Sequence, residues 1–452
     1  MEETNKIKKR KLSHVQIISI GYLLMIAFGT LLLMLPISTA SGEGASFTDA
    51  LFTTTSASCV TGLILRDTAT YWSLFGQIVI ILLIQIGGLG FMTISMMFML
   101  FLRKRVGLRR REIMAESIGA FEVRGIMGLS KKIIIGTALF ETLGALLLSF
   151  RFVPLFGTEK GIYYAVFHSI SAFCNAGFDL MGSEYGEFCS LVNFYDDPLV
   201  SLTICALIII GGIGFWVWDD ICEKKWRVHR YTLHTKIVLC TTAILLLGGT
   251  FIIYFFELYA TGKDMGTGER LLTAFFASCT ARTAGFNTID VAAMADGSKL
   301  VTILLMFIGG SPGSTAGGIK TTTIVVMILQ TLAGVTHRQY VGVFGRRLDN
   351  DSLQKATSVL FTNLTLAIGG VIVICITQSS LGLVDVMFEA FSAIGTVGMT
   401  TGITRSLGTV SRYVIIFLMY LGRIGSVSFA LALMERRTRA AILPPEEKIV
   451  IG

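Results

Sequence analysis

F-H-S-I-S-A-F-C-N-A-G-F (Phe167 to Phe178) is one of four short polar segments that share a pattern, with a Phe at the start and a Gly just before the end. The other three are F-T-T-T-S-A-S-C-V-T-G-L (Phe52 to Leu63), F-F-A-S-C-T-A-R-T-A-G-F (Phe275 to Phe286) and F-E-A-F-S-A-I-G-T-V-G-M (Phe388 to Met399). Each lies between two long apolar stretches. A unit repeated along a chain sets its architecture, so the sequence predicts four copies of one plan around a shared axis.

The composition is typical of a membrane protein. Of the 452 residues, 53% are hydrophobic and 15% are charged, and the mean hydropathy is +0.71. A helix that crosses a bilayer needs about 20 mostly apolar residues. Eight stretches qualify: 14 to 36, 74 to 102, 132 to 153, 199 to 218, 234 to 256, 300 to 333 (interrupted), 356 to 378 and 412 to 434. We predict an all-α membrane protein with eight transmembrane spans, the first too long to be a cleaved signal sequence.

The charged residues indicate how the chain is oriented. Most of the 38 Lys and Arg residues lie in five segments: 6 to 11, 103 to 132, 224 to 236, 338 to 355 and 436 to 448. The positive-inside rule places these segments and both termini in the cytoplasm, so the net charge of +8 does not require a nucleic-acid partner. The opposite loops carry carboxylates that would concentrate cations at a pore mouth, although an ordinary solvated loop explains any one of them equally well. They include Asp179, Glu184, Glu187, Asp196 and Asp197.

The glycine of each polar segment predicts a turn inside the membrane. The residues before it are too few to cross the bilayer but suit a re-entrant pore helix, and non-helical backbone at that depth must line a cavity or be buried in protein. Glycine reaches positive φ without a steric clash, so successive carbonyl groups can point to one centre. Four such turns would form a ring of oxygens that replaces the hydration shell of a monovalent cation.

Packing between helices is the alternative role for any one of these glycines, but four matching copies favour the filter. The predicted K+ filter consists of Val60, Thr61, Gly62, Asn175, Ala176, Gly177, Thr283, Ala284, Gly285, Thr396, Val397 and Gly398. The predicted units are 1–103 with a basic cytoplasmic N-terminus, 104–221, 222–336 with a broken pore-lining helix, 337–440, and a C-terminal tail at 441–452.

A second glycine motif follows each filter segment: I-G-G-L-G-F (Ile86 to Phe91), I-G-G-I-G-F (Ile210 to Phe215), I-G-G-S-P-G (Ile308 to Gly313) and L-G-R-I-G-S (Leu421 to Ser426). The third copy continues as G-G-S-P-G-S-T-A-G-G-I-K-T-T-T (Gly309 to Thr323), which cannot be a regular helix in lipid. We expect it to protrude beneath the filter and obstruct ions. It is not a phosphate-binding loop, because Ile319 interrupts the G-K-[S/T] pattern and no strand precedes it.

The fourth copy carries an Arg where the others have a second glycine. A cation inside a membrane is a functional-site hypothesis by default, so Arg423 is expected in the conduction path, donating hydrogen bonds to the broken segment. Pairing with a neighbouring helix for structure is the alternative. The predicted gate consists of Gly309, Gly310, Ser311, Pro312, Gly313, Ser314, Thr315, Ala316, Gly317, Gly318, Lys320 and Arg423.

Other polar residues have less defined roles. Arg282 is expected to turn behind the filter and pair with a carboxylate. The partner and role of Glu141, midway along a predicted span, stay open. The eight Cys and five His residues show no metal-binding spacing, and we expect free thiols.

Together the four filter segments, the broken sixth span and Arg423 resemble the Trk/Ktr/HKT superfamily of potassium transporters, most closely its Ktr-type (KtrB-like) membrane subunits. The resemblance covers nearly the whole chain, and Gly62 matches the potassium-selective rather than the serine-bearing sodium type. It implies a gate in the broken segment, a homodimer with one pore per protomer, promotion by Na+, and a cytoplasmic RCK-type ring (KtrA-like) that binds ATP or ADP. The tail Leu443 to Gly452 would pack at such a contact, or be disordered.

Three functions are compatible with these observations. A channel-like potassium pathway in the plasma (inner) membrane, gated from the cytoplasm, is the leading hypothesis. A sodium-coupled secondary symporter is the alternative, although carriers of that class typically use inverted or paired repeats. An enzyme or receptor whose glycines only pack is disfavoured, because the sequence offers no nucleophile and base pattern.

Overall fold

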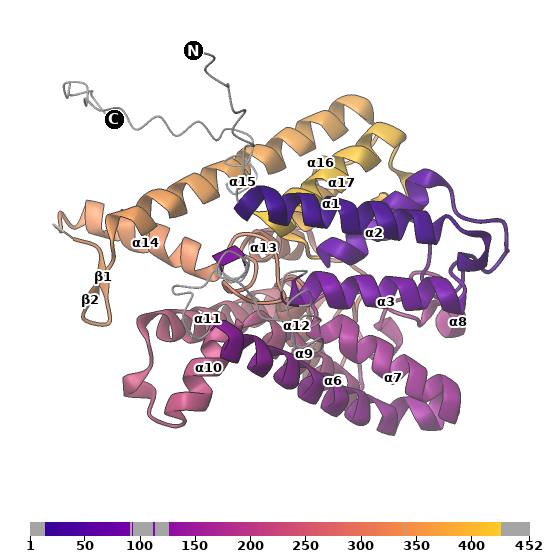
Figure 1. The fold of residues 1–452 in the computed structure, drawn as a ribbon, viewed down its shortest axis with the longest axis horizontal. Helices are drawn as coiled ribbons and strands as arrows, with labels where there is room; N and C mark the ends of the chain where they lie inside the picture. Colours follow the sequence, from indigo (N-terminus) through magenta and orange to yellow (C-terminus); the bar gives the residue numbers. More distant parts are fainter. Residues whose placement is uncertain (1–13, 91–92, 94–111, 114–125, 339, 426–452) are drawn as a thin grey trace, which may run out of the picture.

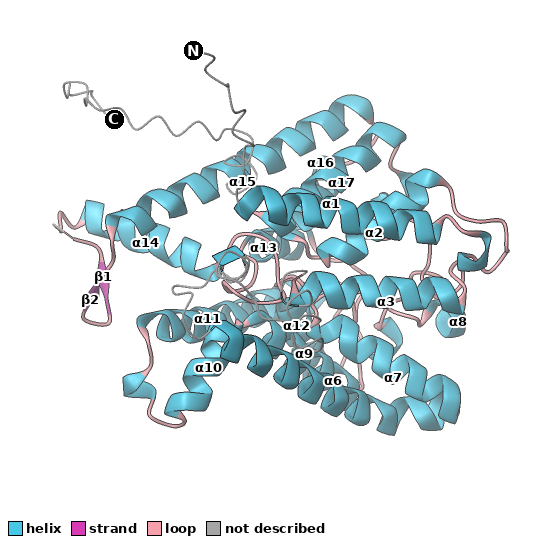
Figure 2. Ribbon diagram, viewed as in Figure 1, coloured by secondary structure: helices cyan, strands magenta, loops and turns pink. Residues whose placement is uncertain are grey.

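The protein is built almost entirely of α-helices (Figure 2). The structure, a computed structural model, describes residues 14–90, 93, 112–113, 126–338 and 340–425. Within these residues the only strands form a two-stranded antiparallel hairpin, with β1 (Gly342–Val343) paired to β2 (Arg346–Arg347).

The helices follow one another along the whole described chain (Figure 1). The α-helices are α1 (His14–Leu33), α2 (Phe47–Cys59), α3 (Leu74–Leu89), α6 (Ile126–Phe156), α7 (Thr158–Phe173), α8 (Gly182–Tyr185), α9 (Pro198–Gly212), α10 (Phe215–Lys224), α11 (Leu233–Phe256), α12 (Thr267–Thr280), α13 (Asp296–Phe307), α14 (Thr321–Val335), α15 (Asn350–Thr377), α16 (Leu383–Gly395) and α17 (Thr409–Ile424). Short 3-10 helices are η1 (Pro36–Ser38), η2 (Val192–Phe194), η3 (Val228–Arg230), η4 (Glu257–Tyr259) and η5 (Ile403–Ser406).

Four helices are long and apolar enough to cross a membrane by themselves: α1, α6, α11 and α15. A fifth candidate is the pair α9 and α10, which is bent by 92°. Two further predicted spans, 74 to 102 and 412 to 434, begin as α3 and α17 and continue outside the described residues. The interrupted span at 300 to 333 corresponds to α13 and α14 with a non-helical segment between them. The total of eight spans therefore stays a prediction.

The bend between α9 and α10 corrects one expectation, since residues 199 to 218 were predicted as one continuous span. Gly214 separates the two helices with φ of +98°. A methyl group on Gly214 would lie 2.6 Å from the carbonyl oxygen of Pro312, so the turn accommodates the segment between α13 and α14. The break also follows the local motif, because the corresponding glycines of the first and fourth copies, Gly90 and Gly425, have φ of +82° and +93°.

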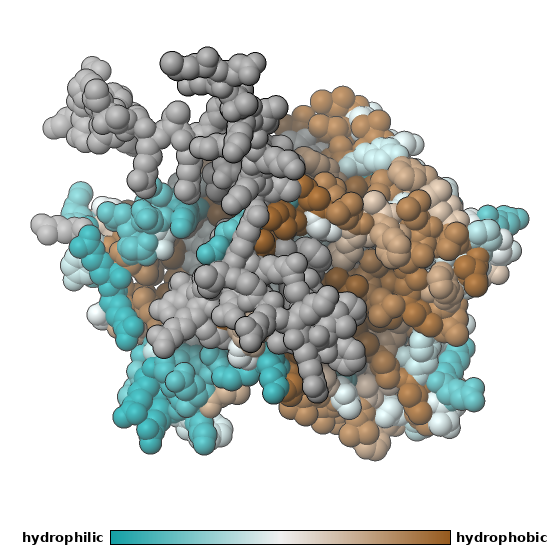
Figure 3. Space-filling model, viewed as in Figure 1, coloured by the Kyte–Doolittle hydropathy of each residue, from teal (hydrophilic) through white to brown (hydrophobic). Residues whose placement is uncertain are grey.

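Large apolar side chains remain exposed on the long helices. On α1, for example, Leu24, Phe28 and Leu31 are each 64% or 65% exposed. Figure 3 shows a broad apolar surface with hydrophilic residues gathered near its left and right margins. An exposed apolar surface of this extent marks contact with lipid.

Each short helix that precedes a filter glycine packs against the long helix before it: α2 on α1, α7 on α6, α12 on α11 and α16 on α15. The Phe that begins the polar segment anchors this packing in three cases, since Phe52, Phe167 and Phe388 are at most 1% exposed. In the third copy the buried ring is that of Phe276, one residue later. The division into four repeats is not tested by these contacts and stays a prediction.

Candidate ion pathway

The backbone takes the same unusual conformation at all four predicted filter segments. The four glycines have positive φ, from +68° at Gly177 to +93° at Gly62. The residue two positions earlier also has positive φ, although none is a glycine: Val60 at +57°, Asn175 at +60°, Thr283 at +72° and Thr396 at +50°. A β-branched residue in this region costs about 1–2 kcal/mol. Strain of this kind clusters at functional sites.

The four segments meet one another in a closed order. A methyl group on Gly177 would lie 2.5 Å from the carbonyl oxygen of Ala284, and one on Gly285 would lie 2.5 Å from that of Val397. Methyl groups on the other two glycines would collide with the carbonyl oxygens of Ala176 (from Gly62) and Thr61 (from Gly398). Each copy therefore touches the next, and the fourth touches the first.

Hydroxyl groups of the short helices hold these segments. The backbone N–H of Gly62 donates to Ser56 Oγ at 3.0 Å, and that of Gly398 donates to Ser392 Oγ at 3.1 Å. In the other two copies Ser171 Oγ and Thr280 Oγ1 donate to the carbonyl oxygen just past the glycine, each at 2.7 Å. The sequence prediction missed these residues, although a Ser at one common position of three segments was a usable signal.

The predicted filter residues are brought together and buried. All eight that are not glycine are at most 1% exposed. Asn175 Nδ2 donates to Thr283 Oγ1 at 3.2 Å, which links the second and third copies. The hydroxyls of Thr61 and Thr396 are buried and have no hydrogen-bond partner among the described residues. Within the part of the chain that the structure describes, no group of three or more His, Cys, Asp or Glu could hold a metal ion.

A cavity of ≈ 420 Å³ is lined by all four glycines. Of the five acidic residues predicted for the pore mouth, only Asp179 lines it. Glu184 and Asp197 instead pair with Lys160 and Arg151. The pKa of Asp179 is raised to about 7, chiefly by burial and also by the nearby Asp67 carboxylate, against a smaller lowering by the hydrogen bond from the Met181 amide. A basic residue, Arg405, also lines the cavity, with its guanidinium 4.3 Å from the ring centroid of Phe188.

The predicted gate segment lies directly against the filter. Gly318 approaches the carbonyl oxygen of Gly395, which a methyl group would meet at 3.0 Å, and Thr315 Oγ1 donates to the carbonyl oxygen of Phe173 at 3.1 Å. Lys320 Nζ donates to the carbonyl oxygens of Ala316 at 2.7 Å and Gly317 at 3.3 Å, which closes the segment on itself.

The break between α9 and α10 holds the other side of the gate segment. Ser311 N–H donates to Gly212 O at 3.0 Å, and Thr315 N–H donates to Gly211 O at 3.2 Å. In return, Phe215 N–H donates to the carbonyl oxygen of Gly313 at 2.7 Å. The gate segment is therefore held by backbone hydrogen bonds with the end of α9 and the start of α10.

Arg423 connects the gate segment to the first part of the chain. Its guanidinium donates to the carbonyl oxygen of Thr315 and to those of Gly87 and Gly88 at the end of α3, the last at 3.0 Å. Among the described residues it has no carboxylate partner. The geometry thus contains both expected contacts, to the broken segment and to a neighbouring helix.

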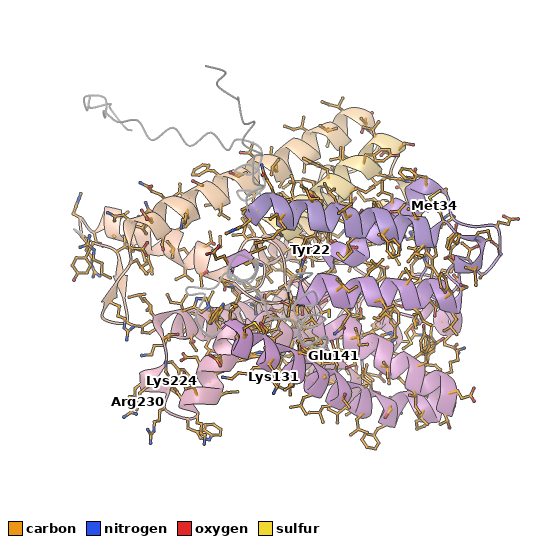
Figure 4. All side chains as sticks on the ribbon, in the orientation of Figure 1. Tyr22, Met34, Lys131, Glu141, Lys224 and Arg230 are labelled. Atoms are coloured by element: carbon orange, nitrogen blue, oxygen red, sulfur yellow. The ribbon has the colours of Figure 1, made fainter. Side chains whose placement is uncertain are left out.

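The expectation for Arg282 is wrong in one respect. The residue is buried, but its guanidinium donates to Thr242 Oγ1 at 3.5 Å, and in the described chain no carboxylate pairs with it. The hydroxyl of Thr242 on α11 takes the place of the acid. Glu141 on α6 (Figure 4) has a partner that sequence did not identify, because Gln85 Nε2 donates to its carboxylate at 3.2 Å.

Comparison with known proteins gives consistent matches over the whole chain. A family model described as TrkH, cation transport protein, matches residues 3–440. The potassium/sodium uptake protein NtpJ of Enterococcus hirae is 40% identical over 450 residues, which cover 98% of both chains. The Ktr system potassium uptake protein B of Bacillus subtilis is 37% identical over 455 residues, 100% of both. The crystal structure of the potassium transporter TrkH from Vibrio parahaemolyticus matches with TM-score 0.74 at 16% identity, over 95% of this chain and 86% of that one.

Proposed function

This chain belongs to the TrkH family of cation transport proteins, and from that premise we propose how it moves its ion. It is a multi-pass membrane protein that takes up potassium, and it is a transporter rather than an enzyme. The proposal concerns the selectivity filter, the gate, the partner subunit and the orientation in the plasma membrane.

The filter is formed by one glycine segment from each of four repeats, with the repeat limits given above. The closed ring of glycine segments carries this proposal. Alternating positive φ values turn successive carbonyl groups toward one side, where they replace the water around K+. Thr61 and Thr396 add two hydroxyls that have no other partner among the described residues. Oxygens held at fixed spacing favour K+ over the smaller Na+.

The gate is the segment between α13 and α14 together with Arg423. The segment lies against the filter, and Arg423 brings positive charge to this level, where it repels a cation. The Arg423 hydrogen bonds to Thr315 and α3 hold the segment in the closed position. Opening then requires the segment to leave these carbonyl contacts.

The regulatory partner is a cytoplasmic RCK-type ring that binds ATP or ADP. The curated relatives named as parts of a Ktr system support a second component, and the basic segments placed inside by the positive-inside rule offer it a surface. Two copies of this chain, each with its own pore, would form the membrane part, with both termini in the cytoplasm.

Three roles for sodium are compatible with this proposal. NtpJ is named as a potassium/sodium uptake protein, which is compatible with Na+ as activator, as second transported ion, or as coupling ion of a symporter. In the channel-like mechanism, K+ flux dissipates a potassium gradient in sodium-free solution. In the symporter, the same flux stops when Na+ is removed.

Ion flux into liposomes that contain the purified protein tests the filter. Gly398→Ser places a side chain against the carbonyl oxygen of Thr61, so we expect it to reduce the preference for K+ over Na+ by about tenfold or more. Gly369→Ala is the matched control, because nothing lies within 4 Å of its added methyl group. Unchanged selectivity in a folded Gly398→Ser protein contradicts the proposed filter.

A further inference from the structure

A surface that neither filter nor gate uses follows α10. It is the sequence K-K-W-R-V-H-R (Lys224 to Arg230), called here the basic turn. Trp226 is 96% exposed and Val228 is 58% exposed, although basic side chains flank both. Trp is typical of the membrane interface, where its ring lies among the lipid headgroups. The exposed indole therefore indicates contact with a headgroup layer.

Several cations of the basic turn are free to bind an external anion. Lys224 is paired with Asp220, and Lys132 of α6 is paired with Asp219. In the described chain no carboxylate pairs with the remaining cations of the turn, Lys225, Arg227 and Arg230. Figure 4 shows Lys224 and Arg230 together at the margin of the molecule, and Figure 3 shows hydrophilic residues gathered over the same region.

The basic turn is joined to the gate through a single short helix. The first residue of α10, Phe215, donates its N–H to the gate carbonyl of Gly313, and the residues just before the bend accept from Ser311 and Thr315. The last residue of α10 is Lys224, the first of the basic turn. At 1.5 Å per residue, α10 is only about 15 Å long. A ligand that fixes the turn therefore also fixes the helix that holds the gate.

We propose that the basic turn binds the headgroups of anionic phospholipids in the cytoplasmic leaflet and that this contact sets the position of α10 and the gate. The choice of ligand rests on charge complementarity between the cations and an anionic headgroup. Trp226 adds an apolar group, which a lipid surface accommodates and which binding to an acidic protein surface does not require. The gating consequence rests on the proposed function and orientation, and the proposal leaves the other basic segments as the surface for the partner ring. Each cation near an anionic membrane contributes about a fivefold gain in affinity. Three unpaired cations give about a hundredfold preference over a neutral lipid.

Lipid contact is measured by fluorescence quenching in vesicles that contain the full-length protein. We expect brominated phosphatidylglycerol to quench Trp226 more strongly than brominated phosphatidylcholine, and Trp226→Phe to remove the difference. The triple variant Lys225→Gln, Arg227→Gln, Arg230→Gln should lose the preference. The matched control, Arg346→Gln with Arg347→Gln in the exposed hairpin β1–β2, should keep it. Equal quenching by the two lipids in the unmodified protein overturns the proposal.

Potassium flux in the same vesicles separates the lipid site from the transport proposal. We expect the flux to change severalfold with the phosphatidylglycerol fraction in the unmodified protein and to be insensitive to it in the triple variant. A triple variant that responds as the unmodified protein does overturns the link to the gate. Absence of flux in every lipid mixture, with the quenching preference intact, contradicts the proposed transport function and leaves the lipid site supported. If the two lipids quench equally, and only an acidic cytoplasmic protein protects Trp226 from quenching, the basic turn binds that protein instead.

Discussion

The four ring segments hold eight residues at positive φ, of which only four are glycines. The glycines of the four segments were predicted, because glycine alone tolerates positive φ without cost. The same conformation at Val60 and Thr396 was not predicted, because a β-branched residue disfavours it locally. In the structure, backbone hydrogen bonds of Val60 and Thr396 to the preceding helix turn and serine hydroxyls on the following glycines accompany that conformation. At Val60 and Thr396 the observed backbone conformation thus differs from the one that the residue type prefers.

The guanidinium of Arg423 is expected to be specific to its site. Arg423→Lys keeps the charge but cannot reach Thr315 and α3 together, because a lysine has one compact ammonium group. We expect both Arg423→Lys and Arg423→Ala to raise the resting K+ flux, with the larger effect in Arg423→Ala. Flux measured in liposomes without any partner subunit checks this. A resting flux equal to that of the unmodified protein in both variants would show that Arg423 does not hold the gate.

Asp179 predicts a dependence on external pH. Because the pKa of Asp179 in the folded protein is raised from 3.8 to about 7, the folded state holds a proton that the unfolded state has lost over this interval. Stability contributed at this site therefore falls as the pH rises from about 4 to 7 and is constant above. We expect the ionised carboxylate to attract K+ to the cavity above pH 7.

Asp179→Asn should remove both effects. We expect the unmodified protein to reach half-maximal uptake at a lower K+ concentration above pH 7 than below it, and the variant to show no such difference. The half-maximal K+ concentration is measured from the rate of uptake at a series of K+ concentrations, at one pH below 7 and one above it. The same pH response in Asp179→Asn would assign the titration to another group.

At the scale of elements, hydropathy predicted which segments are helical but not how one of them bends. The break between α13 and α14 was predictable, because Pro312 and its neighbouring glycines exclude a regular helix. The bend at Gly214 was missed, although it stands at a recurring position of the motif, where Gly90 and Gly425 of the first and fourth copies also have positive φ. What no local pattern contains is the hydrogen bond from Phe215 N–H to the carbonyl oxygen of Gly313.

Gly214→Ala tests the importance of this bend. The substitution places a methyl group 2.6 Å from the carbonyl oxygen of Pro312, at φ of +98°, so we expect a loss of stability of about 1–2 kcal/mol or more and a higher resting K+ flux. Gly248→Ala in α11 is the control, since nothing lies within 4 Å of its added methyl group. Thermal unfolding and resting flux are measured for both. Identical behaviour of the two variants contradicts the role given to the bend.

For the whole molecule, the sequence predicted the helical membrane class and the meeting of four distant segments. It could not show that the gate segment contacts two copies at once, because such contacts depend on how the units dock. Arg423 and Gly87 are far apart in the chain, yet they share a hydrogen bond. The repeated sequence motif describes each unit but does not predict the interfaces between units.

Bound potassium is expected to stabilise the complete fold. A ligand held only by the folded state adds about 2.7 kcal/mol at a hundred times its Kd. We expect K+ to raise the unfolding temperature of the purified protein more than Na+ at equal ionic strength. Gly398→Ser should abolish the difference, whereas Gly369→Ala should retain it. Equal shifts by the two ions in the unmodified protein contradict a K+ site in the ring.

The contact of Gly398 with Thr61 has a consequence for biosynthesis. The first wall of the ring is translated early, but it meets its last neighbour only when almost the entire message has been read. Every nascent chain that ends before Gly398 lacks one of the four segments of this ring. On the proposed function, such a truncated product has no complete filter.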